Sequence, residues 1–416
     1  MTEPTKKLVP ELRFPEFQDA GEWSTKQLGD VAALIKEKAG SKSYTLMSVT
    51  AGVGLVTQIE KFGKEIAGEA YKNYYVIKKG DFAYNKSSTK QHPEGQMALL
   101  ENIDMGAVPN SIFSCFRVDK ESVSPYFLKY PFATNIHGKW LRNFIAVGAR
   151  ANGALNVDSK DLLTLPIVFP SLKEQQKIAN CLSSIDELIT TQTKKIAALK
   201  NHKKGLMQQL FPAEGETVPQ LRFPEFQHSG EWERKPLGEV ATFYNGRAYK
   251  QEELLDQGKY RVLRVGNFFT NKNWYYSDLE LDEDKYCDNG NLLYAWSASF
   301  GPRIWKGEKV IYHYHIWKVV EKPAIHKDFL FTILNFETEK LKSQSANGLG
   351  LMHITKGAIE SWEFSLPKPD EQQKIADCLS SIDDLITTHT QKLEAYKAHK
   401  KGLMQQLFPV ADEVIV

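Results

Sequence analysis

A polar segment from Asn85 to Gly95 gathers two lysines among short hydroxyl and amide side chains. Lysine ammonium groups bind phosphates, and short hydrogen-bonding side chains suit the edges of nucleic-acid bases. The segment follows an expected strand, turn and strand in YYVIKKGDFAYN, so we expect a loop that is open to a ligand. The residues suited to such contacts are Lys86, Ser87, Ser88, Thr89, Lys90 and Gln91. An ordinary solvated surface loop remains the alternative for each of them.

The second half of the chain has a corresponding polar segment, which follows the expected strand LLYAW. We expect a loop from Ser297 to Lys306, in which Arg303 and Lys306 correspond in kind to the two lysines of the first loop. Arginine is the side chain that most often binds guanine with two hydrogen bonds. The candidates in this second loop are Ser297, Ser299, Arg303 and Lys306.

Two further kinds of segment occur in both halves. A Gly- and Asn-rich segment precedes a short helix and a final strand, and the candidates there are Arg142, Arg150, Asn152, Asn347 and His353. An earlier loop is expected around Ser48–Thr50 in one half and around Arg264–Asn267 in the other. The candidates from this second kind of segment are Arg264 and Asn267. All of these side chains can contact phosphates or base edges.

His313 and His315 alternate along an expected strand. A metal site is disfavoured because no cysteine or acidic residue lies nearby at a ligand spacing. We interpret the two histidines as a strand face near a nucleic acid or as core residues, and His313 is kept as a binding candidate. Most of the many aromatic side chains of this region are expected to pack in the core.

Two stretches of the chain occur twice, almost unchanged. Residues 174–212 match residues 371–409 at 31 of 39 positions, and residues 9–32 match residues 218–241 at 17 of 24. The chain is therefore two copies of one unit. Each copy keeps its ends and varies in its middle, whereas a duplicated enzyme would retain the centre that carries its chemistry. The repeated ends are therefore expected to be a scaffold.

Each copy of the longer repeat is expected to form one helix of about 55 Å. Its apolar residues follow the 4-3-4-3 spacing of a coiled-coil seam, from Ile178 to Leu210 and from Ile375 to Leu407. The polar residues at the skipped seam positions are interpreted as fixing the register. They are Gln192, Lys203, His389 and Lys400.

The ends of these helices and their pairing can also be predicted. Ser171 and Glu174 have the spacing of a capping box, and Pro212 and Pro409 end the two helices. Two related units in one chain favour an antiparallel pair. Seam positions whose numbers sum to about 585 would then meet, such as Ile178 with Leu407 and Leu210 with Ile375.

Motifs for catalysis are missing from the sequence. It contains no NPPY-like or DPPY-like tetrapeptide of adenine methylation and no GxxxxGK(S/T) phosphate loop. Gly52–Gly54 is only a lone GxG. Pro369–Glu371 does not fit a nuclease motif, because the equivalent residues of the first copy are Leu172–Glu174. We therefore expect no catalytic site, metal or cofactor in this chain.

The composition limits the setting of the protein. A formal charge of +2 over 416 residues lacks the strongly basic character of a self-sufficient nucleic-acid binder. The 4 cysteines form no CxxC pair, which favours a reduced compartment. No apolar stretch has the length of a signal peptide or a membrane span. We expect a soluble cytoplasmic protein that depends on partners for much of its electrostatic affinity.

The repeated segments resemble the DNA-specificity subunit of type I restriction-modification systems. The resemblance lies in a proline-ended segment that runs into EQQKIA, a long helix with a KKGL tail, and a preceding LRFPEF, GEW and LG(D/E)VA, all present twice. It covers essentially the whole chain. It implies a non-catalytic subunit with two target-recognition domains, each recognising one half of a split, asymmetric sequence in double-stranded DNA. The helices would set the spacer.

The resemblance also implies an α+β fold. Two mixed α/β target-recognition domains, rich in strand, would be joined by two long α-helices in an antiparallel coiled coil. The expected boundaries are residues 1–170 for the first domain, 171–212 for the first helix, 213–367 for the second domain, 368–409 for the second helix and 410–416 for the tail.

The implied partners are two methyltransferase (modification) subunits, which dock on the helical repeats, and restriction subunits with motor activity. S-adenosylmethionine, ATP and Mg²⁺ would be used by these partners. Because two equal partners need the same surface twice, we expect docking at the repeated helix ends, with packing inside the coiled coil as the alternative. The residues are Leu206, Met207, Leu210, Phe211, Leu403, Met404, Leu407 and Phe408. The alternative function is a coiled-coil scaffold that assembles proteins without recognising DNA.

Overall fold

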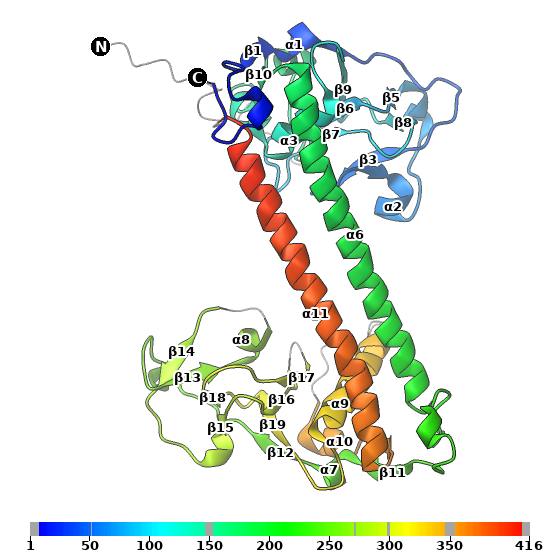
Figure 1. Cartoon of the computed structure of the whole chain (residues 1–416), viewed down its shortest axis with the longest axis vertical. Coiled ribbons are helices and arrows are strands. Elements are labelled where there is room, and N and C mark those ends of the chain that lie inside the picture. The colour runs from blue at the N-terminus through cyan, green and yellow to red at the C-terminus, as the bar shows by residue number, and fades with distance from the viewer. Residues whose placement is uncertain are drawn as a thin grey trace. The chain divides into compact units, whose positions relative to one another are not determined.

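The computed structural model describes residues 8–50, 52–145, 153–269, 272–297, 300–345 and 354–409 (Figure 1). The chain divides into two compact units, which are Met1–Gln192 with Lys392–Val416, and Thr193–Gln391. Each unit contains one strand-rich region and a part of each long helix. The predicted α+β class, with strand-rich regions and two long helices, is confirmed.

The first unit contains mostly short strands. Its strands are β1 (Ser24–Gln27), β2 (Ala32–Leu34), β3 (Met47–Thr50), β4 (Gly54–Thr57), β5 (Tyr75–Lys78), β6 (Asp81–Asn85), β7 (Gln96–Leu99), β8 (Met105–Val108), β9 (Phe113–Val118) and β10 (Pro166–Phe169). Its short helices are α1 (Leu28–Val31), α2 (Gln58–Phe62), α3 (Pro125–Ala133), α4 (Ile136–Leu141) and α5 (Ser159–Leu163). The main sheet is antiparallel in the order β2-β9-β6-β7, and two-stranded sheets pair β1 with β10, β3 with β4 and β5 with β8.

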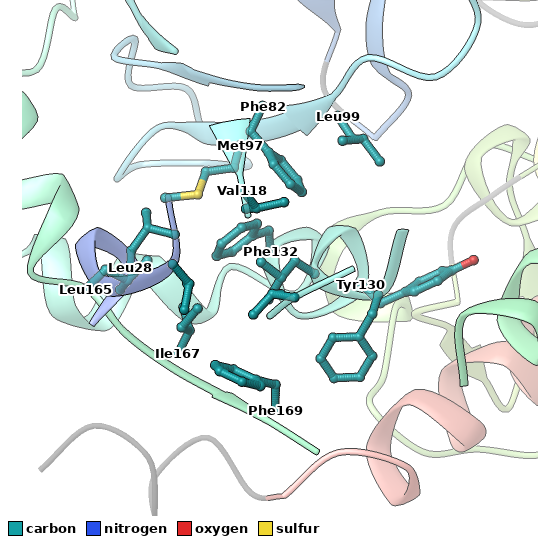
Figure 2. Packing of buried hydrophobic residues seen from close by; sticks show 14 of the residues in the cluster. Leu28, Phe82, Met97, Leu99, Val118, Tyr130, Phe132, Leu165, Ile167 and Phe169 are labelled. Carbon is teal, nitrogen blue, oxygen red and sulfur yellow. The ribbon is translucent and has the colours of Figure 1, made fainter. Parts of the chain in front are cut away.

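The core of the first unit joins the main sheet to the helices (Figure 2). Phe82 and Phe116 stack at 5.1 Å between ring centroids, and Phe132 of α3 meets Phe82 edge-on at 5.3 Å. Leu165 and Ile167, which precede the long helix, belong to the same buried cluster. β6 and β9 are buried along almost their whole length, as expected for the two central strands of the sheet.

The second unit repeats this plan. Its strands are β11 (Glu233–Pro236), β12 (Ala241–Asn245), β13 (Tyr260–Leu263), β14 (Tyr275–Ser277), β15 (Tyr286–Cys287), β16 (Leu292–Ala295), β17 (Gly301–Ile304), β18 (Val310–Tyr312), β19 (Ile316–Glu321) and β20 (Glu363–Leu366). Its helices besides the long pair are α7 (Leu237–Val240), α8 (Val265–Phe269), α9 (Lys327–Ser345) and α10 (Lys356–Glu360). The sheet β12-β19-β16-β17 corresponds in order to β2-β9-β6-β7, and β11 with β20 corresponds to β1 with β10. A second sheet has the order β14-β13-β18-β15.

The two long helices are α6 (Leu172–Leu210) and α11 (Pro369–Gln406). In the first unit Leu407 shares the buried cluster of Ile178 and Leu182, and in the second unit Leu210 shares that of Ile375 and Leu379. The antiparallel pairing and its register are therefore confirmed within each unit. Both helices end within three residues of Pro212 and Pro409, as expected.

The polar seam lysines form ion pairs at the positions that this register brings together. In the first unit Lys400 Nζ lies 2.5 Å from Asp186 Oδ1, and the hydroxyl of Tyr130 donates to Asp186 Oδ2 at 3.0 Å. In the second unit Lys203 Nζ lies 2.7 Å from both carboxylate oxygens of Asp383. A slip of the helices would separate these charges, which agrees with the predicted role in fixing the register.

A buried ion pair explains why the two repeats of each unit occur together. In LRFPEF of the first copy, Arg13 donates from Nε and Nη2 to the two carboxylate oxygens of Glu174, both at 2.7 Å. In the second copy Arg222 makes the same two bonds to Glu371, also at 2.7 Å. The exposed fractions of these side chains are 7% and 1% in the first pair and 8% and 1% in the second. We call these two contacts the Arg–Glu pairs.

The first Arg–Glu pair corrects one prediction about the helix start. Ser171 Oγ accepts the N–H of Glu174 at a long 3.5 Å, so half of the expected capping box is present. The carboxylate of Glu174 binds Arg13 in place of the backbone at Ser171. The second half of the capping-box prediction is therefore wrong, because a guanidinium with two parallel donors is the stronger partner for a carboxylate.

The glutamine that follows each paired glutamate ties the strand-rich region to the helix. Gln175 accepts the N–H of Ser124 at 2.8 Å and donates to the carbonyl of Pro170 at 2.8 Å. Gln372 accepts the N–H of His326 at 2.9 Å and donates to the carbonyl of Pro367 at 2.9 Å. Both glutamines are fully buried. The Glu-Gln dipeptide that both copies share therefore makes buried polar contacts in each unit.

Candidate nucleic-acid interface

The loop after β6 in the first unit is held at its base and open at its tip. Lys86 donates its N–H to Ile112 and accepts the N–H of Leu155 at 2.7 Å, and Ser88 donates its N–H to Gly153 at 2.7 Å. Lys86, Ser87 and Ser88 are half-buried, whereas Thr89, Lys90 and Gln91 are exposed. The base of the loop therefore lies beside the segment that follows residue 152, as an isolated bridge between Ser87 and Ala154 also shows.

Arg142 is held near the end of this loop by an ion pair with Glu94. Its Nε donates to Glu94 Oε1 at 2.5 Å, and Asn135 Nδ2 donates to Glu94 Oε2 at 2.9 Å. The Glu94 side chain is 5% exposed and that of Arg142 is 65% exposed. Burial would raise the pKa of Glu94, but the bonds from Asn135 and Arg142 outweigh it and lower that pKa. A buried carboxylate thus holds an exposed guanidinium, and nothing in the sequence around Glu94 signalled this role.

In the second unit the predicted loop between Ser297 and Lys306 is partly a strand. Arg303 is exposed on β17, with its guanidinium 5.8 Å from the ring centroid of Phe268, and Lys306 is exposed just after that strand. Ser297 is only 7% exposed, so its side chain is covered in this structure. The prediction of a continuous loop is wrong because GPRI pairs with β16 along its whole length.

The histidines are also placed differently from the prediction. His313 and His315 lie in the turn between β18 and β19, with ring centroids 4.9 Å apart, because the strand breaks after Tyr312. Burial, together with the positive charges of His315 and Arg264, lowers the pKa of His313 to about 4. The imidazole of His313 is therefore neutral near pH 7. Among the described residues no cluster of His, Cys, Asp or Glu could hold a metal ion.

The two early segments, which were expected to be loops, consist mostly of regular elements. Ser48–Thr50 belongs to β3, while Arg264 lies between β13 and α8, and Asn267 is in α8, where its Nδ2 donates to the carbonyl of Asn273 at 2.6 Å. Short runs such as MSVT and VGNFF have too few residues to show a period, so neither element could be recognised from its pattern.

Five of the candidate residues lie outside the part of the chain that the structure describes. They are Arg150, Asn152, Ser299, Asn347 and His353. Most of the tryptophans and many other aromatic residues of the second region belong to buried clusters or pack against them, as expected. Among them are Trp274, Tyr275, Trp296, Trp305, Tyr312 and Trp317.

The repeated helix ends are packed within their own units. In the first unit Leu407 is buried, and Leu403, Met404 and Phe408 pack against the same core. In the second unit Leu210 and Phe211 are buried, with Leu206 and Met207 against them. Phe408 meets Trp23 at 6.0 Å, and Phe211 meets the equivalent Trp232 at 6.3 Å. These side chains therefore pack against the core of their own unit, and this packing extends beyond the inside of the coiled coil.

Other apolar side chains of the repeats are exposed. Leu188 of α6 and Leu385 of α11, at the same repeat position, are 46% and 48% exposed. The leading repeat also exposes the same two positions in both copies. These are Val9 and Leu12 in the first copy and Val218 and Leu221 in the second. Each unit thus presents the same exposed apolar positions.

The two units share a duplicated framework and carry different polar side chains, and comparison with known proteins identifies the class to which this arrangement belongs. The family model of the type I restriction modification DNA specificity domain matches residues 20–201 and 229–397. The chain therefore belongs to the family of type I restriction-modification DNA specificity proteins. Among the helices that the structure describes, none combines the length and apolar character needed to cross a lipid bilayer.

Two relatives from Methanocaldococcus jannaschii are similar along much of the chain. A protein described as "Putative type I restriction enzyme MjaX specificity subunit" is 26% identical over 410 residues, which covers 93% of this chain and 92% of the relative. The type I restriction enzyme MjaVIII specificity subunit is 28% identical over 288 residues, covering 65% of this chain and 67% of that relative.

Solved structures share the fold. The S subunit of a type I restriction-modification system from M. genitalium has a TM-score of 0.63 at 15% identity, and the match covers 97% of this chain and 100% of that one. A chain from a study of the assembly and conformational transition of the type I R-M system has a TM-score of 0.53 at 18% identity, with 99% of both chains covered.

Proposed function

We propose that this chain recognises a split, asymmetric sequence in double-stranded DNA, with one half-site bound by each unit and the spacer set by α6 and α11. The observation that carries the proposal is the contrast between framework and loops. Both units share the order of the main sheet and the Arg–Glu pair, but the contact residues Lys86–Gln91 of the first unit are replaced by Arg303 and Lys306 in the second. One framework with two sets of contact side chains suits two different half-sites.

In this proposal the chain is the non-catalytic recognition component of a larger complex. Two methyltransferase subunits bind it, and restriction subunits join that core in the cytoplasm. These partners use S-adenosylmethionine, ATP and Mg²⁺. The names of the relatives, which are specificity subunits of type I restriction enzymes, support this assignment.

The exposed leucines of the long helices are the proposed centre of methyltransferase docking. Leu188 and Leu385 offer the same exposed side chain in each unit, whereas most of the helix-end residues are engaged in internal packing. An apolar side chain that stays exposed outside the seam, at the same position of both repeated helices, is suited to a contact surface. Because the position is repeated, two copies of one partner can use it.

Replacing Leu188 or Leu385 with glutamate is expected to remove one methyltransferase subunit from the complex, and the double replacement is expected to remove both. A buried charge would oppose each interface without disturbing the core of its unit. Native mass spectrometry or light scattering of the co-expressed subunits measures the stoichiometry. Full complexes formed by the double variant would contradict the proposed surface, and the helix content by circular dichroism controls for folding.

Replacing both Lys86 and Lys90 with alanine is expected to weaken methylation of the cognate site by about tenfold or more at physiological salt. Each lysine that contacts a phosphate contributes to the salt dependence of binding, so the slope of log affinity against log salt should fall by about 2. Lys120 is the matched control, because it is exposed in the turn after β9, at the opposite end of the strand from the loop.

The same double variant separates DNA recognition from the alternative function. A scaffold that only assembles proteins would give unchanged methylation, in amount and in sequence, for the Lys86 and Lys90 variant and for the Lys120→Ala control alike. Loss of methylation in the Lys86 and Lys90 double variant, with normal methylation in the Lys120→Ala control, supports contact with DNA through this loop.

A further inference from the structure

One arginine of the second unit, Arg264, lies in an open hollow and has no acidic partner among the described residues, whereas Arg222, Arg234, Arg247 and Arg261 of this unit each pair with a carboxylate. The hollow has a volume of about 370 Å³ and is lined by Arg264, Val265, Gly266, His313 and His315. It lies where the end of β13 and the start of α8 meet the turn between β18 and β19. Two segments about 50 residues apart in the sequence therefore form one concave site.

The side chain of Arg264 makes no hydrogen bond or ion pair with any residue that the structure describes. Its Nε is buried and has no acceptor, and its guanidinium lies over the Tyr275 ring at 4.2 Å from the centroid. The arginines that pair with carboxylates are Arg13, Arg117, Arg142, Arg222, Arg234, Arg247 and Arg261. Leaving a buried donor unsatisfied is unfavourable, so Arg264 is suited to a ligand that brings acceptors.

The surroundings of Arg264 fix its orientation and its charge environment. Stacking on Tyr275 holds the guanidinium plane, as a bidentate contact requires. His313 is neutral near pH 7, so it adds hydrogen-bonding capacity to the hollow without adding charge. The neighbouring Arg261 is paired with Glu308 at 3.0 Å, and its charge is balanced there. The hollow thus has one oriented, unpaired fork of donors.

Two groups of DNA match such a fork, which are the O6 and N7 acceptors of guanine and the oxygens of a phosphate. Phosphate sites usually collect several unpaired cations, whereas here the nearby Arg261 is neutralised by Glu308, and His313, one of the two histidines that line the hollow, is neutral. A concave site with one stacked arginine fits a base edge better. We propose that Arg264 binds a guanine of the half-site that the second unit recognises, and that this contact sets the specificity at that base pair. This inference rests on the function proposed above.

The test uses the complete methyltransferase complex and a library of sites with every half-site position randomised. With the wild-type chain, one position of the second half-site is expected to require guanine. Arg264→Ala and Arg264→Lys are expected to relax the preference at that position alone, by roughly 5- to 150-fold. Preferences in the first half-site should stay unchanged, which also shows that the variant complex is assembled and active.

Several outcomes would overturn the inference. An Arg264 variant that lowers methylation of all sequences equally, with a smaller salt slope and no relaxed position, would identify a phosphate contact. A variant with unchanged preferences would show that Arg264 touches no base. Arg261→Ala is the matched control, since its stacked and ion-paired guanidinium should leave every position as it was. If the wild-type complex itself showed no split site, the proposed function would fail instead.

Arg264→Lys guards against a folding artefact. Lysine keeps the charge and the aliphatic stem, so the unit should fold, but it lacks the rigid fork that matches guanine. A Tyr275→Leu variant, which removes the stacking surface, is expected to relax the same position by a smaller factor. Full guanine preference in both Arg264→Lys and Tyr275→Leu would contradict the proposed geometry.

Discussion

Replacing Arg222 with methionine is expected to lower the free energy of unfolding of the second unit by about 3 to 5 kcal/mol. The guanidinium is 8% exposed and meets a carboxylate that is 1% exposed, with two bonds of 2.7 Å. Removing it leaves the Glu371 carboxylate buried without its counter-charge. A third bond, from Nη1 to the carbonyl of Gly230 at 2.6 Å, is lost as well. Urea denaturation followed by circular dichroism measures the change.

Arg234 provides the matched control within the same unit. It pairs with Glu363 at 3.6 Å, and these side chains are 51% and 63% exposed, so Arg234→Met should cost less than about 1 kcal/mol. Replacing both Arg222 and Glu371 with methionine should cost less than Arg222→Met alone, since no unpaired charge remains. Equal losses in the free energy of unfolding for Arg222→Met and Arg234→Met would show that burial adds nothing to the contribution of the Arg222–Glu371 pair.

The same argument applies to Arg13 and Glu174 in the first unit, whose geometry is nearly identical. Neither pair was visible in the sequence, because its members are 161 and 149 residues apart and each sits in a motif with its own local explanation. The glutamate had a plausible role as a capping residue. Only the fold shows that the leading repeat and the helical repeat are parts of one contact, which accounts for their joint duplication.

The long helices were predictable for a different reason. The apolar spacing from Ile178 to Leu210 repeats over many helical turns, so the periodic signal is strong. The same spacing in the second copy determines the register of an antiparallel pair. The ion pairs of Lys203 and Lys400 follow from that register. Short strands carry no such signal, which is why β17 and the turn at His313 were misplaced.

The candidate site was predictable in its composition and not in its geometry. Polarity singled out the segment around Lys86 and the residue Arg264, but the partner of each charge depends on residues far along the chain. Glu94 is an isolated acidic residue in the sequence, and only the fold shows that it holds Arg142. In the same way, the sequence places Arg264 near Tyr275, but it cannot show that the guanidinium is stacked and lacks an acceptor.

Inserting one heptad into both long helices is expected to move the methylation specificity to sites with a longer spacer. The matched positions follow Gln192 in α6 and Gln391 in α11, where the chain passes between the units. Seven residues add about 10 Å of helix, which is about three base pairs of DNA at 3.4 Å each. A heptad also keeps the seam on the same face to within about 20°. Sequencing of the methylated sites shows the spacer directly.

The twist of DNA sets the size of this effect. Three added base pairs rotate one half-site by about 100° relative to the other at about 10.5 base pairs per turn, and the two units must absorb that rotation. The variant should therefore methylate its new sites less efficiently than the wild type methylates its own, while each half-site keeps its sequence. A heptad in α6 alone is the control, because it mismatches the helices and should abolish methylation at every spacing. If the double insertion still selected the original spacer, the helices would not set the distance between the half-sites.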